Sequence, residues 1–62
     1  MKLNRHKVNI VRARKGLTLQ EMYRAAKVGP NTVIKGYDTD IDPVTVGRIA
    51  KALDVDVTEI ID

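Results

Sequence analysis

The stretch GLTLQEMYRAAKVGPNTVIKGY, residues 16–37, contains two signals for the start of a helix. The first is a capping box, in which the Thr18 hydroxyl can accept from the Glu21 amide while the Glu21 side chain reaches back to the Thr18 amide. The second is Gly29-Pro30. Glycine is tolerated as an N-cap, and proline in the first helical position loses only an amide that has no helical partner there. The stretch therefore predicts two short helices with a very short connection.

Similar signals divide the rest of the chain. Gly16 is suited to end a preceding helix, because glycine readily adopts the left-handed conformation found there. Asp42-Pro43 is a further helix start, and Asp56 begins another box of the capping type. No segment alternates apolar and polar residues for long enough to form a strand. The sequence predicts an all-α fold of five helices, over about 4–15, 19–26, 30–37, 43–53 and 57–61.

Length and composition indicate one small domain. A chain of 62 residues buries only ~60% of its unfolded surface, so its stability is expected to be marginal. It has no Cys for a disulfide or a thiolate metal site, and no Phe or Trp, so the core must be aliphatic with Met. No apolar run approaches a membrane span and no signal peptide is recognisable, so a cytoplasmic protein is expected.

The charge is divided along the chain. Residues 1–37 carry nine Lys or Arg and one acidic residue, whereas residues 38–62 carry two Lys or Arg and seven acidic residues. A basic half joined to an acidic half indicates one face that binds a polyanion and another turned away from it. The alternative is an ordinary solvated surface, since such footprints are not specific.

The short connection over residues 27–29 favours two helices that cross steeply, which is the helix-turn-helix arrangement. In that arrangement the second helix enters the major groove of DNA. At about 100° per residue, Val33 and Tyr37 share one side of the helix over 30–37 and can face the core. The opposite side then carries Asn31, Thr32, Lys35 and, at its edge, Ile34. These are groups that can read base edges, although they are also common on any solvated helix.

Several short motifs resemble the lambda-repressor/Cro-like helix-turn-helix family of XRE type. They are LTLQEM at 17–22, Val28, NTV at 31–33, and TV at 45–46 followed by RIAKAL at 48–53. The resemblance covers nearly the whole chain. It implies a compact five-helix DNA-binding domain over 1–62, with the helix-turn-helix over about 18–37. Such proteins are transcriptional regulators, usually dimeric on palindromic operators, and are common in phages, plasmids and mobile elements.

The resemblance places base contacts at Pro30, Asn31 and Lys35, and a phosphate contact at the start of the preceding helix. Combined with the outward positions of the helix over 30–37, the expected base-contacting residues are Pro30, Asn31, Thr32, Ile34 and Lys35. The expected phosphate-contacting residues are Leu19, Gln20, Arg24, Lys27 and Gly29.

Three departures from the family pattern affect the helix-turn-helix. The family often has Gln at the position of Leu19, so the phosphate contact is expected to pass to Gln20 or to backbone amides. It prefers Ala at the position of Tyr23, where the helices cross closely. It prefers Gly at the position of Lys27, where a residue with a side chain costs ~1 kcal/mol at positive φ.

A fourth departure follows the expected recognition helix. The family often has an apolar residue and then Glu where Gly36 and Tyr37 stand, and that Glu pairs with an Arg of the first helix. Arg12 matches this Arg, and Asp38 is the expected substitute partner.

Other chemistry is poorly supported. Asp38, Asp40 and Asp42 have the spacing that begins a calcium loop, but the following Gly and the acidic residue at the twelfth position are missing. His6, the single His, has neighbours that are basic, and a solvated side chain explains it. No nucleophile–base pair, phosphate loop or paired catalytic carboxylates occur, so no enzyme activity, metal or cofactor is expected.

The expected function is sequence-specific binding of double-stranded DNA by a transcriptional regulator, with repression the favoured direction. A weak homodimer through residues 38–62 is expected, with Val55, Val57, Ile60 and Ile61 as its apolar surface. Two alternatives stay open. One is a protein-interaction module that kept the fold, such as an antitoxin, which exposed Ile60 and Ile61 would suit. The other is an accessory protein that bends DNA for recombination.

Overall fold

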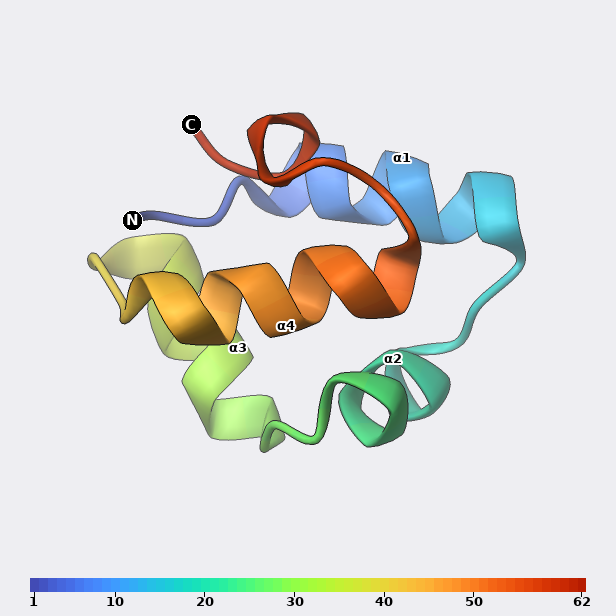
Figure 1. Cartoon of the computed structure of the whole chain (residues 1–62), viewed down its shortest axis with the longest axis horizontal. Coiled ribbons are helices and arrows are strands. Elements are labelled where there is room, and N and C mark those ends of the chain that lie inside the picture. Colours follow the sequence, from blue (N-terminus) through green and yellow to red (C-terminus); the bar gives the residue numbers. More distant parts are fainter.

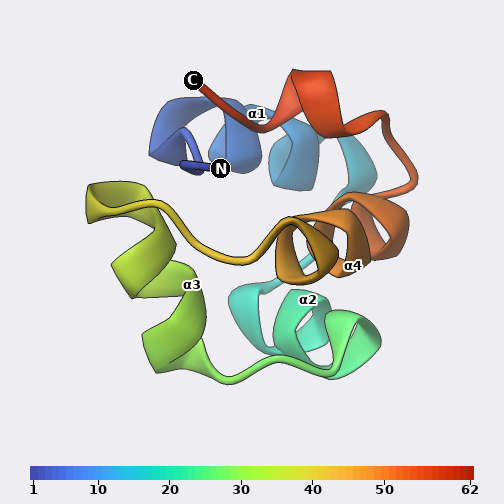
Figure 2. The same cartoon turned by 60° about the vertical axis from the view of Figure 1, so that its left-hand side comes forward.

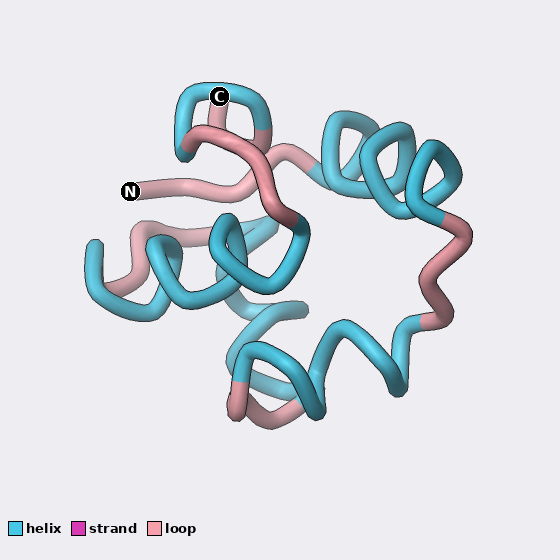
Figure 3. Tube along the Cα trace, turned by 45° about the vertical axis from the view of Figure 1, so that its right-hand side comes forward, coloured by secondary structure: helices cyan, strands magenta, loops and turns pink.

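The computed structural model describes all 62 residues and consists of helices joined by short connections, with no strand (Figure 3). Four α-helices are present, and each agrees with its predicted range to within one residue. None of the four has the length and apolar character needed to cross a bilayer. Their bounds are Arg5–Lys15 (α1), Leu19–Ala26 (α2), Pro30–Asp38 (α3) and Pro43–Leu53 (α4).

The fifth predicted helix, over 57–61, is wrong. Only a single 3-10 turn, η1 (Val57–Glu59), forms there, and Ile60 ends it with φ −125° and ψ 2°. The reason lies at the other end of the chain. The Ile60 carbonyl accepts a hydrogen bond from the Asn4 amide at 2.8 Å, and Ile61 forms an antiparallel bridge with Leu3. The pairing with residues 3–4 takes this segment out of a helical path.

The capping signals around α2 and α3 are confirmed. Thr18 and Glu21 form both hydrogen bonds of the capping box, and Lys27 ends α2. Gly29 is the N-cap of α3, with Pro30 in its first position. Gly16 ends α1 with φ 67°, in the left-handed conformation that was predicted for it.

Two other caps differ from expectation. Asp42 occupies the N-cap position of α4, but its side chain makes no capping hydrogen bond. Asn4, which the sequence reading placed inside the first helix, is the N-cap of α1, and its side-chain oxygen accepts from the Lys7 amide at 2.9 Å. Asn is among the strongest N-cap residues, so this signal was present in the sequence.

The central element is α4, which packs against α2, α1 and η1. In Figure 1, α1 lies above α4 and α2 below it, and Figure 2 shows α3 along one side of this stack. After the connection over 27–29 the chain turns away from α2, so α3 does not lie antiparallel to it. One long side of α3 therefore faces away from the rest of the molecule.

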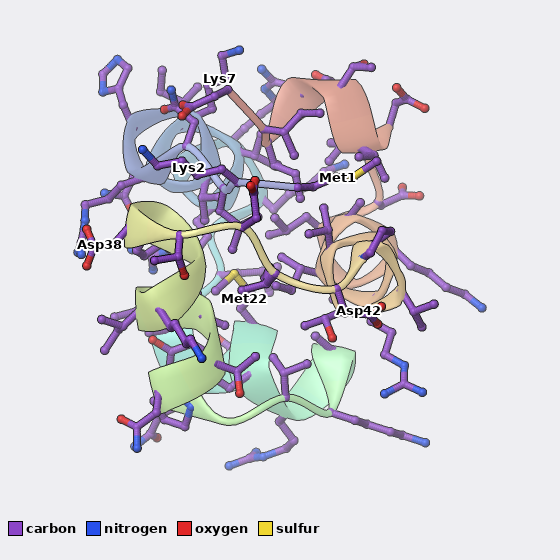
Figure 4. All side chains as sticks on the ribbon, turned by 90° about the vertical axis from the view of Figure 1, so that its left-hand side faces the viewer. Met1, Lys2, Lys7, Met22, Asp38 and Asp42 are labelled. Atoms are coloured by element: carbon purple, nitrogen blue, oxygen red, sulfur yellow. The ribbon has the colours of Figure 1, made fainter.

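The core is aliphatic, as the composition predicts. Met22 from α2 lies near its centre, between α3 and α4 (Figure 4). The side chains of α1, α3 and α4 that meet it are completely or almost completely buried. Eleven residues form this core: Leu3, Val8, Val11, Met22, Ala26, Val33, Val46, Ile49, Ala50, Leu53 and Ile60.

Candidate nucleic-acid interface

The outward face of α3 has the composition that the sequence predicts. Val33 is fully buried and Tyr37 half-buried, so they anchor the inner side of the helix. Asn31 and Lys35 lie about 40° apart around the axis and one turn apart along it, at the centre of the exposed side. Ile34 is 46% exposed at the edge of that side. All five expected base-contacting residues are exposed: Pro30, Asn31, Thr32, Ile34 and Lys35.

The start of α2 offers free backbone amides beside an exposed aliphatic residue. The Glu21 amide donates to the Thr18 hydroxyl at 3.1 Å, but the amides of Leu19 and Gln20 donate to no group in the chain. Unpaired amides at a helix start carry partial positive charge and bind anions. Leu19 itself is 42% exposed and has no polar side-chain atom. A phosphate contact at this position would therefore use the amides or Gln20.

The start of α3 also has backbone amides with no partner in the chain. Because Pro30 has no amide hydrogen, the first donors at the start of α3 are the amides of Asn31 and Thr32. No hydrogen bond within the chain uses either amide. The side chain of Asn31 and the beginning of the helix therefore present donors on the same exposed surface.

Three basic side chains near α2 and α3 are free of ion pairs. Arg24, Lys27 and Lys35 are all exposed, and none forms a salt bridge or a side-chain hydrogen bond. Their positive charge is therefore available to a polyanion. The expected phosphate-contacting residues Leu19, Gln20, Arg24, Lys27 and Gly29 are all exposed.

The basic side chains before α2 are placed differently. Lys2 lies 3.8 Å from Asp62, Arg14 lies 3.5 Å from Glu59, and the Lys7 ammonium donates to the Ile61 carbonyl at 2.9 Å. Lys15 forms a further pair at 3.8 Å with Asp54. Three of the nine basic side chains in residues 1–37 are thus paired with carboxylates of the C-terminal residues.

These contacts place part of the basic half of the chain against its acidic half. Two basic residues of the acidic half, Arg48 and Lys51, lie beside Lys27. Together with three alanines they line a shallow hollow of about 340 Å³ between α2 and α4. The alanines are Ala25, Ala26 and Ala52.

The connection between α2 and α3 contains a residue at positive φ, as was expected at Lys27. Lys27 has φ 57°, in the left-handed region where a side chain is unfavourable. Its amide donates to the Arg24 carbonyl at 3.3 Å, which closes the last turn of α2. Tyr23 is half-buried and packs against the core.

The expected ion pair between Arg12 and Asp38 does not form. Arg12 instead donates to the Leu17 carbonyl at 3.0 Å and to the Asn9 side chain at 3.1 Å, so it braces the connection between α1 and α2. The ring of Tyr37 lies under a different basic residue, Arg5, whose guanidinium carbon is 4.4 Å from the ring centroid. Burial raises the pKa of Tyr37, which keeps its hydroxyl neutral.

The expected apolar dimer surface is largely used inside the molecule. Ile60 is fully buried, and Val55, Val57 and Ile61 are half-buried against the core. The description of Ile60 and Ile61 as exposed apolar groups is therefore corrected. The large apolar side chain that residues 38–62 do expose is Val44, at 60%.

The acidic connection after α3 does not resemble a metal site. Asp38 and Asp42 point in different directions, one beside α3 and the other beside α4 (Figure 4). Nowhere do three or more His, Cys, Asp or Glu side chains gather in a way that could hold a metal ion. His6 is exposed and makes no side-chain hydrogen bond, in agreement with a solvated side chain.

Comparison with known proteins finds no matching family model, and no curated protein or solved structure that is significantly similar to the chain.

Proposed function

We propose that this chain is a sequence-specific DNA-binding regulator of transcription, of the lambda-repressor/Cro-like helix-turn-helix type, with repression its favoured action. The observation that carries the proposal is the exposed side of α3, where Asn31 and Lys35 occupy the centre and neither side chain is engaged within the chain. Asn and Lys also occur on ordinary solvated helices, but here they lie one turn apart on the side of α3 that no other element covers. A helix that reads base edges needs such groups there.

In this proposal α2 and α3 are the two helices of the helix-turn-helix, and α3 enters the major groove. Asn31 would pair with adenine through its amide, Lys35 would donate to the acceptors of guanine, and Ile34 would contact a thymine methyl group. The free amides of Leu19 and Gln20 would bind one backbone phosphate at the groove edge. Arg24 and Lys27 would add contacts to phosphates that carry no sequence information.

One domain of this size covers about one half-site, so useful specificity calls for two copies on a palindromic operator. We propose a weak homodimer through residues 38–62, with exposed Val44 as its apolar contact. Because one apolar side chain buries little surface, this dimer is expected to form on DNA rather than in dilute solution.

Measurement of affinity for random duplex DNA across a salt series tests the proposal in its simplest form. A DNA-binding protein that neutralises several phosphates loses affinity steeply, and the slope of log affinity against log salt reports their number. Selection of bound duplexes from a random pool then tests for sequence preference. A flat salt dependence, or a selected pool with no common sequence, would contradict the proposal.

The alternative of a protein-interaction module was based on exposed apolar side chains at Ile60 and Ile61. Ile60 lies in the core, so it offers no such surface. A role in bending DNA for recombination makes a separate prediction. A bending protein would change the mobility of a duplex according to the position of the site, whereas the proposed regulator needs no such change.

A further inference from the structure

The first four residues form a strap over the C-terminal end of α3. The Leu3 amide donates to the Gly36 carbonyl at 2.8 Å, and the Ile41 amide donates to the Met1 carbonyl at 2.7 Å. The carbonyl of Gly36 is among the last four of α3, which have no partner within the helix. The strap therefore satisfies a helix end that would otherwise be left to water.

The other edge of the strap is bound to the C-terminal segment. The Asn4 amide donates to the Ile60 carbonyl at 2.8 Å, and the Asp62 amide donates to the Lys2 carbonyl at 3.1 Å. Figure 4 shows Met1 and Lys2 between the connection that follows α3 and the C-terminal residues. The strap thus joins α3 to a part of the molecule that lies far away in sequence.

Leu3 and Gly36 fit one another closely. Leu3 is 1% exposed, and Gly36 is buried beneath it. A Cβ atom on residue 36 would lie 2.9 Å from Leu3 Cδ1 and 2.8 Å from Ile41 Cδ1, closer than such atoms approach in proteins. A side chain at this position would therefore force the side chains of Leu3 and Ile41 to shift from where they pack.

Besides the strap, Tyr37 holds this end of α3, where it is half-buried and its ring lies under the Arg5 guanidinium. The helix is absent from the pairs of elements that pack most extensively, all of which involve α4 or α1. Its buried anchors are Val33 in the middle and Gly36 near the end, with Tyr37 half-buried. Val33, in the middle of α3, leaves the helix free to tilt about that point. The contact at Gly36 therefore determines the tilt.

We propose that Leu3 and Gly36 are positioning residues that set the tilt of α3, and thereby the register in which Asn31 and Lys35 meet the bases. This inference rests on the proposed function. The strap, and not an ion pair of Arg12, would then orient α3. The Arg12 guanidinium instead donates to the Leu17 carbonyl and to the Asn9 side chain.

The test compares three single variants of the whole chain. Leu3→Val removes the Cδ1 atom that faces Gly36, Gly36→Ala adds a methyl group from the opposite side, and Ile49→Val is the control. Ile49 is fully buried on α4, which makes no hydrogen bond to residues 1–4, and the substitution removes one methyl group from the core. Each variant is titrated with a duplex of the sequence that the wild type selects and with random duplex, alongside a thermal melt.

Both strap variants are expected to lower the ratio of specific to random affinity about fivefold, the equivalent of weakening one base contact. Ile49→Val is expected to have a lower melting temperature than the wild type and the same ratio of specific to random affinity. Combining Gly36→Ala with Leu3→Val and Ile41→Val removes both close contacts and is expected to restore the ratio. If the strap variants keep the wild-type ratio, or if the control lowers it equally, the proposal is overturned.

Hydrogen exchange separates this outcome from a failure of the proposed function. If the wild type selects no sequence, the proposed function fails, and the amides of Thr39 and Ile41 still report on the strap. Their partners are the Lys35 and Met1 carbonyls. Faster exchange of these two amides in Leu3→Val than in Ile49→Val supports the positioning role. Equal exchange in the two variants contradicts it.

Discussion

Thr18 and Glu21 exchange two hydrogen bonds at the start of α2. The Thr18 amide donates to Glu21 Oε1 at 3.0 Å, and the Glu21 amide donates to the Thr18 hydroxyl at 3.1 Å. Thr18→Ala removes one bond directly and is expected to cost ~1 kcal/mol of unfolding free energy. Asp42→Ala is the matched control, because Asp42 holds the same position before α4 without a capping bond. Denaturant titration should show a clear loss of unfolding free energy for Thr18→Ala alone. Equal losses for Thr18→Ala and Asp42→Ala would argue against the capping box as a stabilising feature.

The same box makes stability depend on pH. The hydrogen bond from the Thr18 amide is the main cause that holds the pKa of Glu21 below its ordinary value of 4.5; the Thr18 side chain is the second cause, and Arg24 adds to the effect. Since the folded pKa is the lower one, the unfolded chain binds more protons in acid. The contribution of Glu21 is therefore present above the ordinary pKa and disappears as pH falls through the folded value.

Glu21→Gln isolates this effect from the other carboxyl groups. The melting temperature of the variant should lie below that of the wild type at pH 7, and the two should converge in strong acid. Asp56, whose pKa is lowered by hydrogen bonds from the side chain and amide of Thr58, titrates in both proteins and cancels in the comparison. If the difference in melting temperature between the two proteins does not narrow in acid, the pH dependence does not come from Glu21.

Lys27 is expected to lower the stability of the fold and to strengthen binding to DNA. Its φ of 57° suits glycine, so Lys27→Gly should relieve ~1 kcal/mol of strain, offset in part by the greater freedom of glycine in the unfolded chain. Asp54→Gly is the matched control, since Asp54 has φ 56° at the end of α4. Both variants should be at least as stable as the wild type. Lys27→Gly alone should weaken binding to random DNA, and unchanged binding would remove Lys27 from the interface.

The acidic C-terminal residues are expected to lie away from DNA. Asp54 and Glu59 face Lys15 and Arg14 across exposed ion pairs, which contribute little to stability. Asp54→Lys and Glu59→Lys should leave DNA affinity nearly unchanged or raise it slightly through the long-range field. Binding assays at two salt concentrations check this, with circular dichroism to confirm folding. A loss of affinity in a folded variant would place this surface on DNA.

Local signals account for what the sequence predicted well. The box at Thr18, the Gly29-Pro30 start and the left-handed Gly16 each act within a few residues, so α2 and α3 could be bounded closely. The spacing of Val33 and Tyr37 then oriented α3 and placed Asn31 and Lys35 outward without knowledge of the remaining fold.

Contacts between distant residues explain what the sequence did not predict. Nothing near Gly36 indicates that Leu3 covers it, and nothing near Ile60 indicates that Asn4 takes its carbonyl and ends the helical path. The pairing of Lys15 with Asp54 likewise depends on how α1 lies against the C-terminal segment. One signal was available and missed, because Gly36 falls on the inward side of α3 next to Val33, where a missing side chain implies close approach of another segment.

Whether α3 reads DNA sequence is tested by comparing the affinities of Asn31→Ala and Arg24→Ala for selected and random duplexes. If Asn31 pairs with adenine, Asn31→Ala should cost ~1–3 kcal/mol on the selected sequence and much less on random DNA. Arg24, exposed on α2 and free of ion pairs, should affect all sequences alike and reduce the salt slope by up to ~1. The loss of affinity should therefore depend on sequence for Asn31→Ala and be independent of sequence for Arg24→Ala. Equal losses of Asn31→Ala on selected and random DNA would show that α3 does not read the sequence.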